Sequence, residues 1–173
     1  TIVVGAFGSD HESRKWDWVV DAAEAIAAAH DDTLFLYAGS AGELLRKMVR
    51  SVDYRTLGRL PSDELSTAIS AMDLFLTPFR KGISSRKGSA IIALQHGIAT
   101  LTSNGPQTDQ LFVDASLDLV DCNDKEAFVK QAVRVSEDPV YRRALAQSGL
   151  ELYDRVFSWD VVADVFRSAF ETR

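Results

Sequence analysis

Short apolar runs alternate with stretches of helical periodicity along this chain, and this alternation constrains the fold more than any other feature. The apolar runs, interpreted as strands, are residues 2–7, 33–38, 54–60, 74–79, 98–103 and 117–120. The helical patterns are residues 14–30, 43–52, 62–72, 88–97, 123–137, 140–157 and 160–170. Strands that alternate with helices form a parallel sheet covered on both faces, and right-handed crossovers wind it doubly. The sequence therefore predicts an α/β, Rossmann-like, doubly wound parallel sheet of about six strands with a helical C-terminal tail.

The domain organisation follows from the length of the chain. We expect residues 1–173 to form a single domain, because this length suits one hydrophobic core and no internal repeat is visible. The chain begins at Thr1, directly inside an apolar run, so we also expect it to be a fragment of a longer protein.

Three local signals predict where helices begin and end. Ser40 and Glu43 have the spacing of a capping box, in which both side chains satisfy free backbone N–H groups. Asn123, with Glu126 three residues later, predicts a second such start. Gly97 predicts the C-terminal stop of the helix before it.

Composition excludes several classes of partner. The formal net charge of −6 argues against nucleic acid, because phosphate attraction requires a basic surface. A single cysteine, Cys122, excludes an internal disulfide framework and a multi-cysteine zinc site. No apolar run approaches the ~20 residues of a membrane span, and residues 1–10 lack the basic flank of a signal peptide. We therefore expect a cytoplasmic protein.

The loop between the fourth predicted strand and the following helix is the strongest candidate for a binding site. Ligands of such sheets bind beyond the carboxyl ends of the strands, where this loop must lie. It concentrates four cations in an acidic chain, together with two glycines and several serines, and a helix N-terminus follows it. These features predict a phosphate cradle; the alternative is a solvated basic loop that only caps the helix. The four cations are Arg80, Lys81, Arg86 and Lys87.

Common catalytic motifs are absent from the sequence. The loop is not a P-loop, because Lys87 precedes Gly88 instead of following it. The first turn lacks G-x-G-x-x-G, and no G-x-S-x-G elbow is present, so neither NAD nor a hydrolase triad is indicated. His30 and His96 stand at the C-terminal ends of helices and are interpreted as partners of the helix dipole. His11 lies in a loop on the ligand side of the sheet, and a role in binding is left open for it. Trp16 and Trp18 on the first helix are expected to pack in the core or against another domain, and not to stack on a ligand.

Four segments follow one another in a particular order and spacing. They are residues 57–65 (LGRLPSDEL), 71–78 (AMDLFLTP), 93–103 (ALQHGIATLTS), and an ending of Asp138-Pro139, a helix and Phe157-Ser158-Trp159. Together they resemble the C-terminal, donor-binding half of GT-B glycosyltransferases, in particular the large retaining group called family 4. The first segment resembles that family's G-x-[LV]-P-x-x-E-L, the second its A-D-[LV]-x-[LV]-x-P and the third its A-M-A-x-G-x-P-V.

The resemblance implies a role for several residues. The phosphates of a nucleotide-sugar donor would lie against Gly8, Ser9, Lys15 and the loop formed by Ser84, Ser85, Arg86, Lys87, Gly88 and Ser89. The base and ribose would lie near Arg59, Leu60 and Ile92. The implied partners are a UDP- or GDP-linked sugar and an N-terminal domain of the same chain. A peripheral membrane contact would be possible only through that N-terminal domain. No metal or other cofactor is implied, because no acidic D-x-D motif is present.

The sequence departs from the family pattern at the carboxylates. The family's E-x7-E falls on Ser84 and Ile92, and its usual Arg falls near Ser9, so His11 or Arg14 would have to substitute. No catalytic residue is assigned for this reason. Two alternatives to a glycosyltransferase half therefore stay open: a degenerate, non-catalytic GT-B-like binding module, and a sugar-nucleotide epimerase domain.

Overall fold

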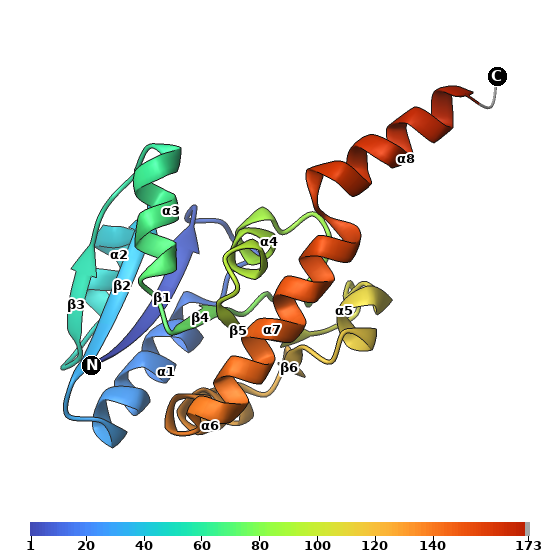
Figure 1. Cartoon of the computed structure of the whole chain (residues 1–173). Helices are drawn as coiled ribbons and strands as arrows, with labels where there is room; N and C mark the ends of the chain where they lie inside the picture. Colours follow the sequence, from blue (N-terminus) through green and yellow to red (C-terminus); the bar gives the residue numbers. More distant parts are fainter. Residues whose placement is uncertain (172–173) are drawn as a thin grey trace.

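One six-stranded sheet forms the centre of the protein, and all of its strand pairs are parallel (Figure 1). The computed structural model describes residues 1–171. The strand order is β3-β2-β1-β4-β5-β6. Successive strands are added in one direction from β1 to β3 and in the opposite direction from β4 to β6, as a doubly wound sheet requires. The strands are β1 (Ile2–Gly8), β2 (Thr33–Gly39), β3 (Asp53–Thr56), β4 (Leu74–Thr77), β5 (Ala99–Asn104) and β6 (Asp118–Asp121).

Helices cover both faces of the sheet, because the central strands are apolar on both sides. The burial pattern of β4 shows all four of its residues buried. The helices are α1 (Trp16–Ala29), α2 (Gly42–Met48), α3 (Ser62–Ser70), α4 (Gly88–Gln95), α5 (Gln110–Asp114), α6 (Lys125–Glu137), α7 (Pro139–Val156) and α8 (Trp159–Glu171). The sequence missed α5, whose five residues are too short for a helical period to show.

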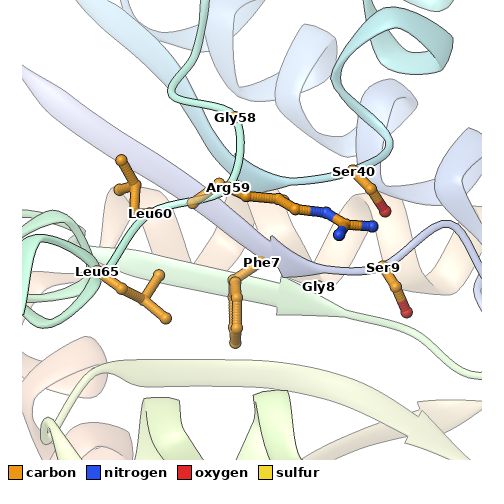
Figure 2. A pocket seen from close by; sticks show the side chains of 10 residues that line it. Phe7, Gly8, Ser9, Ser40, Gly58, Arg59, Leu60 and Leu65 are labelled. Carbon is orange, nitrogen blue, oxygen red and sulfur yellow. The ribbon is translucent and has the colours of Figure 1, made fainter. Parts of the chain in front are cut away.

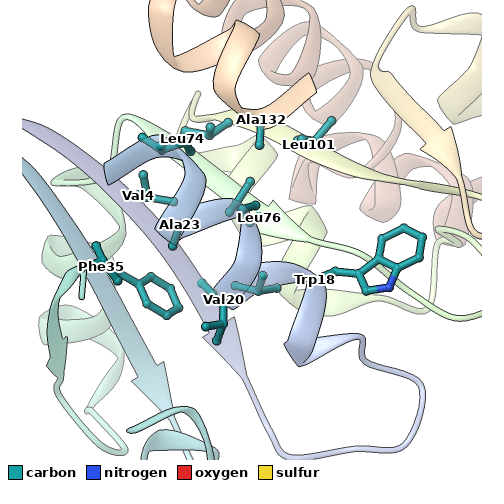
Figure 3. Close-up of a cluster of buried hydrophobic side chains, with 14 of the residues drawn as sticks. Val4, Trp18, Val20, Ala23, Phe35, Leu74, Leu76, Leu101 and Ala132 are labelled. Carbon is teal, nitrogen blue, oxygen red and sulfur yellow. The ribbon is translucent and has the colours of Figure 1, made fainter. Parts of the chain in front are cut away.

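The largest apolar cluster lies between the sheet and the pair α1 and α6 (Figure 3). Val4 of β1 and Ala23 of α1 are fully buried in it. Trp18 of α1 meets Phe128 of α6 with ring centroids 5.5 Å apart. Trp16 and Trp18 are 6% and 5% exposed, which confirms that they pack in the interior. On the other face, α3, α4 and α7 bury two smaller clusters.

Several predicted element ends are wrong. The second helix ends at Met48 and not at residue 52, and the fourth strand ends at Thr77 and not at residue 79. The third strand ends at Thr56 and not at residue 60, because the chain bends at Gly58 with a φ of 65°. Ser40 caps no helix: its hydroxyl accepts the N–H of Asp10 at 3.2 Å, and α2 follows an N-cap at Ala41. The cap of α6 is Asp124, whose carboxylate accepts the N–H of Ala127. The α4 helix ends before Gly97, as predicted.

The last helix, α8, extends away from the body of the protein (Figure 1). Its apolar side chains are therefore largely exposed, with Trp159 at 80% and Phe170 at 75%. Within residues 1–171, no helix combines the length and the apolar character that a membrane crossing requires.

Candidate functional site

A cleft with three adjoining cavities runs along the carboxyl edge of the sheet. The apolar compartment, of about 330 Å³, is lined by Phe7, Gly8, Ser9, Ala38, Gly39, Ser40, Gly58, Arg59, Leu60 and Leu65. The cationic compartment, also about 330 Å³, is lined by Phe7, Gly8, Ser9, His11, Ser13, Arg14, Phe79, Arg86, Lys87, Gly88 and Ser89. The polar compartment, about 370 Å³, is lined by Ser84, Arg86, Lys87, Pro106, Gln107, Thr108 and Asp109. The cationic compartment shares Phe7, Gly8 and Ser9 with the apolar one, and Arg86 and Lys87 with the polar one.

The apolar compartment lies where β1, β2 and the segment after β3 end (Figure 2). The loops after β1 and β2 approach so closely that a Cβ on Gly39 would lie 1.9 Å from the carbonyl oxygen of Gly8. Tyr37 fixes this approach, because its hydroxyl donates to that same carbonyl at 2.6 Å and accepts the N–H of Ala41 at 2.8 Å. Figure 2 shows the Arg59 side chain extending across the cavity toward Ser40.

The cationic compartment is organised by Arg14. Its guanidinium donates to the hydroxyl of Thr77 at 2.6 Å, to the carbonyl of Phe7 at 3.3 Å and to the hydroxyl of Ser89. Backbone bonds hold the loop that carries Arg14 against the end of β4, with the N–H of Arg80 donating to the carbonyl of Ser13 at 2.9 Å. The guanidinium is thus fixed at the meeting point of β1, β4 and α4.

Three cations meet in this compartment without an anion. Arg14 and Lys87 both lie against the ring of Phe79, at 4.6 and 4.9 Å from its centroid. Burial lowers the pKa of Arg14 to about 10, and burial followed by the charges of Arg14 and Arg86 lowers the pKa of Lys87. Within residues 1–171, none of these three cations forms an ion pair with a carboxylate. A bound anion would relieve this repulsion.

The N-terminus of α4 faces the same compartment. Its N-cap, Lys87, contributes no side-chain hydrogen bond, so the first turn keeps free N–H groups, and Gly88 and Ser89 of that turn line the cavity. The positive end of the helix dipole adds to the field of the side chains. Backbone N–H groups and cations together suit the oxygen atoms of a phosphate.

The polar compartment lies between two loops joined by their backbones. The N–H of Gln107 donates to the carbonyl of Lys81 at 2.8 Å, and the N–H of Asp109 donates to that of Ile83 at 3.2 Å. The Asp109 carboxylate accepts the N–H of Ser85 at 2.6 Å, and hydrogen bonds from Ser85 lower the pKa of Asp109. Asp109 is the one carboxylate that lines any of the three compartments.

Most of the predicted site residues come together in this cleft. Gly8, Ser9, Arg86, Lys87, Gly88 and Ser89 line the cationic compartment, Arg59 and Leu60 the apolar one, and Ser84 the polar one. Ser85 lies beside the polar compartment, where its N–H is bound to Asp109.

Two predicted residues point elsewhere. The Lys15 ammonium contacts the carbonyl of Cys122 and lies 3.8 Å from the ring centroid of Trp18. Ile92 lines a separate groove between α3 and α4 and packs with Leu65 against an apolar cluster.

Arg14 occupies the place expected for Lys15, and it is one of the two residues named as substitutes for the family's arginine. The other substitute, His11, also lines the cationic compartment, and its Nδ1 accepts the N–H of Ser13 at 3.1 Å. The remaining histidines have structural partners: His30 Nε2 lies 3.0 Å from the Ser136 hydroxyl, and His96 Nδ1 donates to the carbonyl of Ile92 at 2.8 Å. Within residues 1–171, no group of three or more His, Cys, Asp or Glu side chains could hold a metal ion.

Comparison with known proteins identifies the family. Residues 1–138 match the family described as "Glycosyl transferases group 1". The chain belongs to this family. A curated relative is 22% identical over 157 residues, which are 86% of this chain and 41% of the relative. It is the GDP-mannose-dependent monoacylated alpha-(1-6)-phosphatidylinositol monomannoside mannosyltransferase of Corynebacterium glutamicum.

Solved structures share the fold of this glycosyltransferase chain. A mutant of S. aureus TarM, solved in complex with fondaparinux, alpha-GlcNAc-glycerol and UDP, matches 97% of this chain and 35% of its own, with a TM-score of 0.78 and 12% identity. The C-terminal domain of a glycosyl transferase group 1 family protein (LpcC) from Francisella tularensis matches 91% of this chain and 87% of its own, with a TM-score of 0.74 and 14% identity. This chain thus spans less than half the length of the curated relative and of TarM.

Proposed function

We propose that this chain is the donor-binding half of a glycosyltransferase that moves a sugar from a nucleotide diphosphate sugar to an acceptor. The observation that carries the proposal is the unpaired cluster of Arg14, Arg86 and Lys87 at the N-terminus of α4. An apolar compartment adjoins this cluster and shares three lining residues with it. A nucleoside diphosphate has the same two parts, a flat base and a group of negative oxygens.

The chemistry that this geometry supports is stabilisation of the leaving group. When the bond between the sugar and the diphosphate breaks, negative charge accumulates on the departing oxygen atoms. Cations and N–H groups that are already in place stabilise this charge without reorganisation. Arg14, Arg86 and Lys87 would supply the positive charge, so the proposal requires no metal ion or other cofactor. The acceptor and any catalytic base would lie outside this chain.

The relatives support a nucleotide sugar as the donor. One curated relative depends on GDP-mannose, and one solved neighbour holds UDP. The apolar compartment is lined largely by backbone and apolar side chains, with which the uracil of UDP or the guanine of GDP could make contact. Both UDP- and GDP-linked donors therefore belong to the proposal. Membership of family 4 and a cytoplasmic location are also part of the proposal.

The domain arrangement is a proposal as well. We take residues 1–173 as a donor-binding domain whose partner is an N-terminal domain of the same longer chain. Two observations support this arrangement. The curated relative and TarM are more than twice as long as the segment that matches, and α8 presents an apolar face that the described chain leaves uncovered. Burial of that face against a second domain would stabilise both.

Calorimetry with the 173-residue chain tests the proposal. We expect UDP or GDP to bind with a Kd of roughly 1 mM or below, since only half of the expected cleft is present. The Lys87→Met variant should weaken this binding about tenfold, because it removes a charge-assisted contact. Lys47→Met, on the exposed surface of α2, is the matched control and should leave binding unchanged. Lack of binding to either nucleotide at millimolar concentration would contradict the proposal.

One observation favours a second candidate, a binding module without transferase activity. Ser84 and Ile92 stand where family members carry carboxylates, and Ile92 points into an apolar cluster. Such a module would bind the nucleotide but would neither transfer nor hydrolyse the sugar. Incubation of the complete two-domain protein with UDP-glucose and GDP-mannose, with release of UDP or GDP as the readout, separates the two candidates.

A further inference from the structure

The groove between α3 and α4 takes no part in the function proposed above. Its volume is about 490 Å³, and facing residues of the two helices line it. Ser62, Ser66 and Ile69 follow one another at helical spacing along one side of α3. Ile92 and His96 stand four residues apart at the end of α4. The groove is therefore a second cavity of a size that takes a small molecule.

The imidazole of His96 is held between two partners in this groove. Its Nδ1 lies 2.8 Å from the carbonyl oxygen of Ile92, and its Nε2 lies 2.8 Å from the hydroxyl oxygen of Ser66. A carbonyl oxygen can only accept a hydrogen bond, so Nδ1 carries the proton of the neutral ring and Nε2 keeps a free lone pair. The Ser66 hydroxyl therefore donates to Nε2.

The hydroxyl of Ser66 does not behave like an ordinary hydroxyl on a helix. Thr67, the next residue, bonds the carbonyl of Asp63 one turn earlier at 3.0 Å, which is the common pattern for Ser and Thr in helices. Ser66 instead bonds to a base on another helix. A hydroxyl, an imidazole that accepts from it and a carbonyl that orients the imidazole are the parts of an activated serine nucleophile.

The lining of the groove indicates which group such a nucleophile would attack. Among the described residues, those that line the groove include no Lys, Arg, Asp or Glu, so nothing there attracts a phosphate. Leu65, Ile69 and Ile92 supply apolar surface, which suits a short alkyl chain. The Gln95 amide and the Ser62 hydroxyl are exposed donors at the same groove, where they can stabilise an oxygen that becomes negative. A neutral ester with a short acyl chain satisfies all of these groups.

We propose that Ser66 is a nucleophile that accepts an acyl group from an ester or thioester, with His96 as its base. The Ser66 Oγ forms a bond to the carbonyl carbon while its proton moves to His96 Nε2. The bond to the leaving alcohol or thiol then breaks, and His96 returns the proton to that leaving group. Attack by water, with His96 again as the base, releases the carboxylic acid and restores the hydroxyl. The proposal is independent of nucleotide binding, because Ser66 and His96 line no compartment of the cleft.

The test uses two activated esters with the 173-residue chain. p-Nitrophenyl acetate and p-nitrophenyl butyrate report the rate through release of p-nitrophenol, and mass spectrometry of the whole chain and of its peptides locates the acyl group. We expect the acyl group on Ser66. The butyrate should react up to about tenfold faster than the acetate, because its longer chain gains contact with the apolar side chains of the groove.

Three variants separate a nucleophile from a hydroxyl that only links two helices. Ser66→Ala should abolish acylation at this position, and alanine suits a helix. His96→Gln should slow acylation of Ser66 about 100-fold or more, because the base is lost. Ser70→Ala is the matched control, since Ser70 is exposed on the same helix but does not line the groove. It should react as wild type does. The Tm of each variant shows whether it is folded.

Other outcomes overturn the proposal. Acyl groups found only on lysines or on the amino group of Thr1 would show that Ser66 is not a nucleophile. Equal rates of Ser66 acylation in His96→Gln and wild type would show that the bond between Ser66 and His96 only holds α3 against α4. Equal rates with both esters would show that the groove does not hold the acyl chain. The peptide map of wild type decides the first point even if a variant does not fold, and UDP or GDP binding is measured separately.

Discussion

The guanidinium of Arg14 donates a hydrogen bond to the hydroxyl of Ser89, and this bond joins the loop after β1 to the first turn of α4. Both residues line the cationic compartment. The bond orients a planar group with several N–H donors toward the free N–H groups of the helix. A lysine at this position would keep the charge but lose the forked geometry.

Replacement of Arg14 by Lys is therefore expected to weaken UDP and GDP binding about tenfold, because one charge-assisted contact is lost. Calorimetry at constant ionic strength measures the effect. Arg46→Lys on α2 is the matched control, since Arg46 pairs with Glu43 on the exposed surface. Equal affinity of the Arg14→Lys variant and wild type would show that the phosphates do not contact this guanidinium.

The charge of Lys87 is expected to lower the stability of the ligand-free chain and to strengthen nucleotide binding. Burial and the charges of Arg14 and Arg86 lower its pKa in the folded chain, so its charged form is disfavoured there. The cost is complete at pH values below the folded pKa, falls as pH rises from the folded to the unfolded pKa, and is absent above the unfolded pKa. Lys87→Met should thus raise the Tm of the ligand-free chain by roughly 1–2 °C.

Thermal unfolding with and without 5 mM UDP or GDP separates the two effects of this substitution. The ligand should raise the Tm of wild type and have little effect on the variant, because a ligand that binds only the folded state stabilises it. The Lys47→Met control should show the wild-type response. A lower Tm for ligand-free Lys87→Met would show that the contact with Phe79 outweighs the cost of the charge.

The periodic features of the sequence were sufficient to predict the architecture. The buried strands are apolar on both faces, so their runs stand out, and helices such as α1 show a clear apolar stripe. Element ends depended on partners far along the chain. Ser40 resembles a cap in sequence, but its hydroxyl is taken by Asp10, which lies 30 residues away. A local pattern carries no information on such a partner.

The sequence was sufficient to predict which loop forms the site, but not which individual side chains enter it. Gly88, Ser89, Arg86 and Lys87 are consecutive, so their convergence at a helix N-terminus follows from the sequence alone. Arg14 and Lys15 are neighbours with opposite orientations, and which of them enters the cleft depends on the packing of Trp18 and the position of Cys122. The contact between Asp109 and Ser85 was not predicted, because nothing in the local sequence of either residue shows that the two loops lie side by side.

Glu24 gives a prediction on stability and its pH dependence. Glu24 of α1 is buried, and its carboxylate accepts the N–H groups of Arg50 and Ser51 in the segment between α2 and β3. Burial alone would raise its pKa, but hydrogen bonds from Ser51 and Arg50 prevail, so the pKa is lowered. Glu24→Gln should therefore lower the free energy of unfolding by about 1–3 kcal/mol at pH 7.

The effect of Glu24→Gln should depend on pH in a defined direction. A lowered folded pKa contributes stability above the unfolded pKa of about 4.5, and this contribution is lost as pH falls through the folded pKa. Urea unfolding of wild type and variant at pH 7 and at pH 3 measures the difference, which should shrink at the lower pH. Glu43→Gln on the exposed face of α2 is the control. A difference that grows at low pH would contradict the assigned hydrogen bonds.

The apolar face of α8 gives the last prediction. Phe166 and Phe170 are 63% and 75% exposed, and together with Trp159 they line one open surface. Side chains that are this exposed add little to the stability of the isolated chain, but they make it prone to self-association. The double variant Phe166→Ser with Phe170→Ser should keep the wild-type Tm within about 2 °C and reduce both self-association and binding of the dye ANS.

Analytical ultracentrifugation across a concentration series, together with ANS fluorescence, checks this prediction. Val140→Ser removes an equally exposed apolar residue at the start of α7 and is the control for a general change in surface polarity. It should leave association and dye binding as in wild type. If the double variant instead loses several degrees of Tm, α8 packs on its own body in solution, and the face that we assign to a second domain is already covered.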